Sequence, residues 1–162
     1  MNTQVLQGFI MALSLLDSNI FAAFDSLPDG VLAEIATRVA FAPQKDQGIY
    51  RFQILTSGEV REVDNKGEVD SLVVLGAEYI ELLQAAIEGV ELEGLAEAVG
   101  PMCFDAPAVV VQVNKPSTQE TKLVQTTIAC KTADAVDAKA RQVAEVIQQL
   151  RDALRSFRRL SP

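Results

Sequence analysis

Apolar residues recur at helical spacing near the beginning of the chain. Over residues 5–24 they follow one another at intervals of three and four, and further apolar residues widen this face. We expect a helix that is apolar on most sides, which must be buried in the domain or against a partner. The positions of this segment predicted to make protein contacts are Leu6, Phe9, Leu13 and Leu16.

A second helix is expected directly afterwards. Ser26 can cap its start, Pro28 is tolerated in a first helical turn, and Pro43 cannot continue it. The apolar stripe expected for this helix comprises Val31, Leu32, Ile35 and Val39. These two predictions make residues 1–43 an N-terminal helical segment.

Alternating apolar and polar residues predict a β-hairpin over residues 48–63, with its turn at residues 57–58. A helix is predicted over residues 72–90, although residues 72–75 could instead be a short buried strand, which periodicity leaves open. The face expected to be apolar on that helix comprises Leu75, Tyr79, Leu82, Ala86 and Val90. A separate short helix is expected over residues 92–99.

Two further strands are predicted in the second half of the chain. The β-branched run of residues 108–113 is typical of a strand covered on both faces, and residues 122–131 alternate like an antiparallel partner. We therefore expect an α/β protein of the α+β type, with a central antiparallel sheet of about four to five strands packed by helices. Residues 44–131 would form this sheet with inserted helices, within a single domain of residues 1–162.

The most regular pattern lies at the end of the chain. Thr132 can cap a long helix over residues 132–162, which no glycine interrupts. Its apolar residues recur at alternating intervals of four and three, a heptad pattern typical of helices that pair. The helix could cover the sheet, or its distal end could pair with another helix. The protein contacts predicted there are Leu150, Leu154 and Phe157.

The charge distribution sets this last helix apart. The net charge is −8, yet residues 132–162 hold 6 basic and 4 acidic side chains. Such basic residues either complement the helix dipole or contact an acidic surface, for example that of a neighbouring copy. The arginines clustered at the distal end, which we include among the predicted protein contacts, are Arg151, Arg155, Arg158 and Arg159.

The sequence contains few residues or motifs suited to catalysis, cofactor binding or metal binding. Histidine, the commonest general base and metal ligand, is absent, and no phosphate-binding loop or dinucleotide fingerprint occurs. The acidic composition disfavours binding to nucleic acid. Glu78 and Glu81 share one flank of a predicted helix, where we expect a solvated acidic face. We therefore predict no enzymatic activity, no cofactor and no metal.

The cysteines and the N-terminal segment provide evidence about the cellular location of the protein. Cys103 and Cys130 lie among apolar or β-favouring residues, so we expect two buried reduced thiols, with a mutual disulfide or a reactive thiol as alternatives. The apolar stretch of residues 9–16 lacks the basic flank of a signal peptide and is too short to span a membrane. These observations predict a cytoplasmic protein without membrane insertion.

The expected order of helix, hairpin, helix, strands and long terminal helix resembles that of roadblock/longin-type domains. In that family a central antiparallel sheet lies between helices and the proteins dimerise as scaffolds, so the resemblance implies a scaffold or regulatory role. Residues 107–154 are also similar in pattern to the end of small phage tail-completion and adaptor proteins. That second likeness implies a viral structural role.

Taken together, the patterns predict a non-catalytic assembly or scaffold protein. It would bury apolar helix faces against a second copy or another protein, most simply as a homo-oligomer. One alternative is a regulatory or small-ligand-binding domain with an apolar pocket between sheet and helices. The other alternative is a phage structural or adaptor protein.

Overall fold

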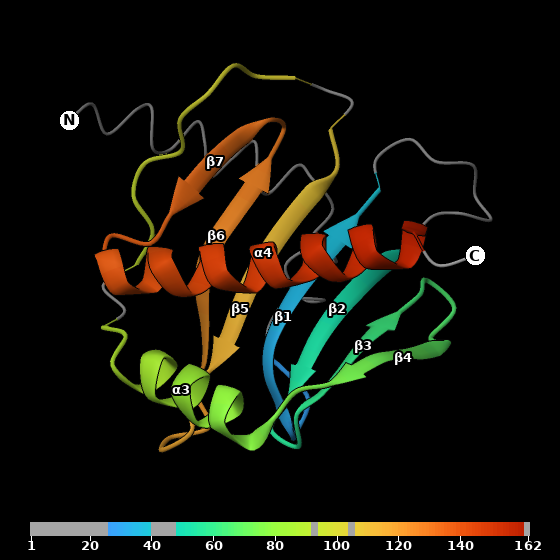
Figure 1. Cartoon of the computed structure of the whole chain (residues 1–162). Coiled ribbons are helices and arrows are strands. Elements are labelled where there is room, and N and C mark those ends of the chain that lie inside the picture. Colours follow the sequence, from blue (N-terminus) through green and yellow to red (C-terminus); the bar gives the residue numbers. More distant parts are fainter. Residues whose placement is uncertain (1–25, 40–47, 92–93, 104–105, 161–162) are drawn as a thin grey trace.

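A computed structural model describes residues 26–39, 48–91, 94–103 and 106–160. Within them, seven strands form one sheet and two helices lie together on one of its faces (Figure 1). The strands are β1 (Val31–Arg38), β2 (Ile49–Leu55), β3 (Glu59–Val63), β4 (Val69–Val74), β5 (Ala108–Asn114), β6 (Thr121–Ile128) and β7 (Lys131–Asp134). The helices are α3 (Ala77–Glu88) and α4 (Ala138–Leu160).

Every neighbouring pair of strands in the sheet is antiparallel, and the order is β4-β3-β2-β1-β5-β6-β7. β1 is therefore the central strand, with three strands on either side. The chain builds one half of the sheet from β1 to β4, crosses the face as α3, and returns beside β1 with β5 (Figure 1).

The predicted fold class, with four to five strands and N-terminal helices, is wrong. Residues 31–38 form β1, where we predicted the second helix. Residues 31–36 are all buried, so the sequence of this strand lacks the apolar–polar alternation of a half-buried strand. Such a sequence is equally compatible with a helix. The helix predicted over residues 5–24 lies outside the described residues.

Several boundaries also differ from the prediction, while the hairpin of residues 48–63 is confirmed as β2 and β3. Residues 72–74 belong to β4, and the helix that follows begins only at Ala77. The strand predicted over residues 122–131 is divided by a turn at Ala129 and Cys130, both of which have positive φ. α4 begins at Ala138 rather than near residue 132.

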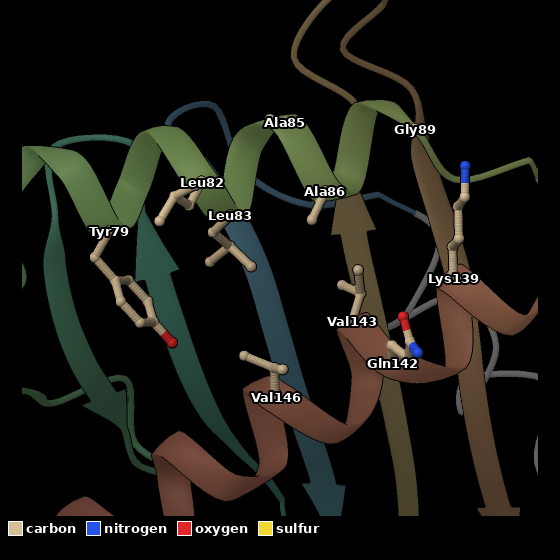
Figure 2. Close-up of a pocket in the computed structure, with 10 residues that line it drawn as sticks. All are labelled: Tyr79, Leu82, Leu83, Ala85, Ala86, Gly89, Lys139, Gln142, Val143 and Val146. Atoms are coloured by element: carbon tan, nitrogen blue, oxygen red, sulfur yellow. The ribbon is translucent and has the colours of Figure 1, made fainter.

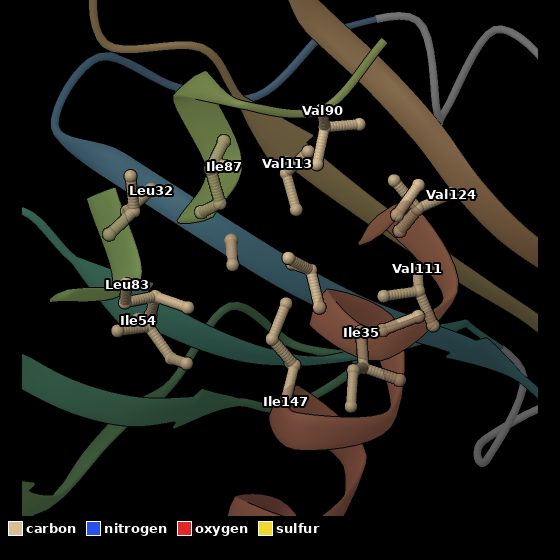
Figure 3. Packing of buried hydrophobic residues seen from close by; sticks show 14 of the residues in the cluster. Leu32, Ile35, Ile54, Leu83, Ile87, Val90, Val111, Val113, Val124 and Ile147 are labelled. Atoms are coloured by element: carbon tan, nitrogen blue, oxygen red, sulfur yellow. The ribbon is translucent and has the colours of Figure 1, made fainter. Parts of the chain in front are cut away.

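The main core lies between the sheet and the two helices. α4 crosses the strands of the sheet and buries Ala140, Val143, Ala144 and Ile147. Figure 3 shows Ile147 among Ile35 of β1 and Val111 of β5, all of which are almost completely buried. Fully burying a side chain of this size contributes roughly 1.5–3 kcal/mol. These contacts fix the position of α4 on the sheet.

Residues 94–103, which we call the strap, run along the outer edge of β7. We predicted a short helix over residues 92–99; instead residues 94–99 pair with β7 and the chain after it. The backbone N–H of Val99 donates to the carbonyl of Thr132 over 3.0 Å, and the N–H of Thr132 donates back over the same distance. The strap therefore covers backbone groups that would otherwise be exposed at a sheet edge.

A disulfide between Cys103 and Cys130 joins the end of the strap to the β6–β7 turn, with the two Cα atoms 5.5 Å apart. The N–H of Cys103 also donates to the carbonyl of Ala129 over 2.9 Å. The reduced thiols that we expected are thus replaced by the alternative, a mutual disulfide. The sequence does not reveal it because the two cysteines are 27 residues apart and meet only through strap pairing.

Neither of the two helices in the described residues is long and apolar enough to cross a membrane.

Replacing both cysteines, as Cys103→Ala with Cys130→Ala, should lower the free energy of unfolding by about 3–4 kcal/mol. This estimate is the chain entropy restored to the unfolded state when a loop of this length is opened. Urea denaturation of the variant and of the unaltered protein measures the difference. A decrease below about 1 kcal/mol would show that the disulfide contributes little to the fold.

Candidate interaction surface

The predicted contacts on the terminal helix divide into two groups. Leu150 and Leu154 are partly buried and pack against the core between sheet and helices. Phe157 is 74% exposed, and so is the neighbouring Leu160, at 83%. The apolar residues of the heptad pattern therefore pack over the sheet as far as Leu154, and those beyond Leu154 are exposed to solvent. Leu6, Phe9, Leu13 and Leu16 lie outside the described residues.

The distal arginines contact acidic side chains of the chain's own sheet. Arg155 Nε lies 2.9 Å from Glu62 Oε1 on β3, and Arg158 Nη1 lies 3.7 Å from Glu62 Oε2. Arg158 also donates to Asp70 of β4, and this hydrogen bond raises the pKa of the Arg158 guanidinium above its ordinary value. The distal half of α4 is thereby held over the β3–β4 edge.

The other two arginines of this cluster have different surroundings. Arg151 Nε lies 3.0 Å from Asp152 Oδ1, next to it on the helix, and Arg159 is exposed. Ion pairs between exposed side chains each contribute about 0–1 kcal/mol. The cluster thus orients the end of α4 more than it stabilises the fold.

An apolar stripe runs along one side of α4. Its members Val146, Ala153, Phe157 and Leu160 are exposed and follow one another at intervals of seven, four and three residues. Such spacing places them on a single side of a helix. That side differs from the one that holds Ile147 against the sheet. α4 therefore has a core side and a second, exposed apolar side.

A groove of about 540 Å³ separates α3 from α4 and begins where this stripe begins. Figure 2 shows side chains of the two helices pointing toward one another across it. Leu83 and Val143 are buried within it, whereas Leu82 is 73% exposed. The residues lining the groove are Tyr79, Leu82, Leu83, Ala85, Ala86, Gly89, Lys139, Gln142, Val143 and Val146.

The groove exists because α3 presents small residues to α4. Ala85, Ala86 and Gly89 have little or no side chain, so only the small Ala86 side chain of α3 points toward Val143. Lys139 is the one charged residue among those that line it. A mostly apolar groove with few polar groups can bind an apolar side chain or ligand.

Three of the groove residues belong to a pattern that is visible in the sequence. Tyr79, Leu82 and Ala86 belong to the helix face that we predicted to be apolar. The buried residues of α3 lie on a different face and are Ile80, Leu83 and Ile87. α3 therefore has two apolar faces, of which the sheet covers only one.

The opposite face of the sheet carries a polar network that sequence reasoning missed. Glu34 of β1 is completely buried and alternates with Ile35, so its side chain points away from the helices. Arg51 Nη1 donates to Glu34 Oε1 over 2.5 Å, and Gln53 Nε2 donates to Glu34 Oε2 over 2.6 Å. Arg61 Nε then donates to Gln53 Oε1 over 2.9 Å. Both carboxylate oxygens of Glu34 are thus satisfied from β2.

One further polar contact links α3 to the β5–β6 connection. The hydroxyl and the backbone N–H of Ser117 both donate to the Glu88 carboxylate. These hydrogen bonds lower the pKa of the Glu88 carboxyl below its ordinary value.

In the described part of the chain, no group of three or more Cys, Asp or Glu side chains is arranged to hold a metal ion.

Comparison with protein-family models, with curated proteins and with solved structures gives no match. The likeness to roadblock/longin-type domains and the likeness to phage adaptor proteins therefore receive no support from relatives. The assembly, ligand-binding and phage-adaptor hypotheses all stay predictions, and the geometry of the helix layer is the basis for choosing among them.

Removing the buried carboxylate with Glu34→Ala should lower the free energy of unfolding by about 3 kcal/mol, because breaking a buried ion pair leaves its partner uncompensated. Glu62→Ala is the matched control. Glu62 also pairs with arginines, but at the surface, so its loss should cost at most about 1 kcal/mol. Urea denaturation measures both variants. Equal effects of the two substitutions would contradict the structural role assigned to Glu34.

Proposed function

We propose that this chain is a non-catalytic assembly protein that associates with a second copy through its helix layer. The observation that carries the proposal is the exposed apolar stripe of α4, which leads from the α3–α4 groove to Phe157 and Leu160. Large apolar side chains gathered on one side of a fixed helix are typical of an interaction surface.

The energetics require more than the end of the helix. Burying Phe157 and Leu160 contributes roughly 1.5–3 kcal/mol each. Bringing two proteins together costs roughly 4–15 kcal/mol in lost translational and rotational freedom. A dimer buries these two residues from each copy, which contributes roughly 6–12 kcal/mol and does not exceed the upper part of that range. A stable assembly therefore also needs to bury apolar residues of the groove.

A small-ligand-binding domain is the second candidate function. The groove supports it, because its volume of about 540 Å³ lies in the range of small-molecule sites, roughly 300–1,000 Å³. Lys139 and Gln142 are its polar groups on α4. A carboxylate with a long apolar chain, such as palmitate, matches this combination of an apolar lining and one cation.

The cytoplasmic location stays a prediction, and the disulfide bears against it. Structural disulfides persist mainly in oxidising compartments and are rare in the cytosol. The Cys103–Cys130 bond therefore favours an oxidising compartment for the working protein.

Light scattering tests the proposed assembly. The unaltered protein should have a mass above that of one chain, 17.5 kDa, and the double variant Phe157→Glu with Leu160→Glu should be a folded monomer. The control, Val99→Glu with Met102→Glu, adds the same charge to exposed strap residues and should keep the unaltered mass.

A monomeric unaltered protein would overturn the assembly proposal. A rise of its melting temperature with palmitate, and no such rise in a Leu82→Glu variant, would then establish the ligand-binding function in its place. An oligomer whose mass is unchanged by the double substitution would also overturn the proposal, because the α4 stripe would not be the surface used.

A further inference from the structure

We infer that the groove and the end of α4 are the two halves of one reciprocal interface, in which Phe157 and Leu160 of each copy occupy the α3–α4 groove of the other. We call these two residues the α4 tip. The inference rests on the proposed function, since it names the site that the tip contacts. A twofold axis makes the interface isologous, so that both grooves are filled at once.

The positions of the tip and of the groove on α4 allow this arrangement. Both lie on the same side of the helix, because Val146 of the groove and Phe157 of the tip belong to one stripe. The tip lies about 20 Å further along the helix than the groove, at about 1.5 Å per residue. A twofold axis across α4 near Leu150 sets two such helices antiparallel and brings Phe157 opposite residues 143–146 of the second copy.

The shapes and chemistry of the two parts match. The groove lacks large side chains from α3 where Ala85, Ala86 and Gly89 lie, and its buried floor includes Leu83 and Val143. An aromatic ring and a leucine are large apolar groups of the kind that fill such spaces at interfaces. Insertion would also cover Leu82, which is 73% exposed in the single chain.

Charge favours the same orientation. Two copies with a net charge of −8 each repel one another unless oppositely charged regions meet. In the antiparallel arrangement the exposed Arg159 beside the tip approaches the second copy's helix layer opposite its Arg141. The acidic partner there is α3, which carries the exposed Glu78 and Glu81 and no basic residue. A parallel arrangement would place the same ends of the two helices together and lose this complementarity.

The tip is also held in place before association. Arg155 and Arg158 connect the last turns of α4 to Glu62 and Asp70 of the sheet. A helix end fixed in this way loses less conformational freedom on binding than a frayed one.

Cross-linking between two engineered cysteines tests the contact. Protein carrying Leu82→Cys is mixed with protein carrying Phe157→Cys under mild oxidation, while the native cysteines remain joined to each other. Air oxidation converts the two new thiols to one disulfide and releases two protons and two electrons to oxygen. The yield of linked dimer should exceed, by at least about tenfold, that of a control mixture with Val99→Cys in place of Leu82→Cys.

A second pair of variants gives an independent readout. Leu82→Glu alone and Phe157→Lys alone should each reduce the dimer fraction in light scattering, and an equimolar mixture should restore it, because a carboxylate then faces an ammonium group. Both sites are mostly exposed in the single chain, so circular dichroism should show an unchanged fold.

The failures can be told apart. If the unaltered protein is a monomer, both the inference and the proposed function fail. If it is an oligomer that loses mass with Phe157→Glu and Leu160→Glu, but shows no cross-link above the control and no restoration on mixing, only the reciprocal interface is overturned. A cross-link to Val99→Cys as strong as that to Leu82→Cys would likewise overturn it.

Discussion

The packing of α4 across the sheet is the contact on which the rest of the structure depends. Ala140, Val143 and Ile147 hold the helix against the central strands, and the ion pairs of Arg155 and Arg158 hold its end over β3 and β4. Because the helix cannot rotate, its second apolar side faces solvent beyond α3. The groove and the exposed tip are both consequences of that fixed rotation.

Other features link neighbouring strands and cover one edge of the sheet. Glu34, at the centre of the sheet, joins β1 to β2 on the face away from the helices, so that neighbouring strands are linked on both faces. The strap and its disulfide cover the β7 edge. At the other edge, β4 has a register shift against β3 and carries Asp70, features that discourage pairing with another strand. Association is therefore expected through helices rather than through sheet edges.

The sequence predicted the hairpin and the terminal helix because each has one clear period, and it predicted the strand of residues 108–113 from its run of β-branched residues. It failed for β1, where burial on both faces removes the period, and for residues 94–99, whose pairing depends on β7. At the candidate surface, Phe157 was identified from the heptad pattern. The exposure of Leu82 was not predicted, because a helix with two apolar faces does not reveal which face the sheet will cover.

Hydrogen–deuterium exchange of the unaltered protein, measured at low and at high protein concentration, tests the central claim most directly. That claim is that the second apolar side of the helix layer is the surface used for association. Amides of residues 82–89 and 153–160 should exchange more slowly at high concentration, and those of residues 94–103 should not change. Slowed exchange confined to other segments, or exchange independent of concentration, would contradict the account.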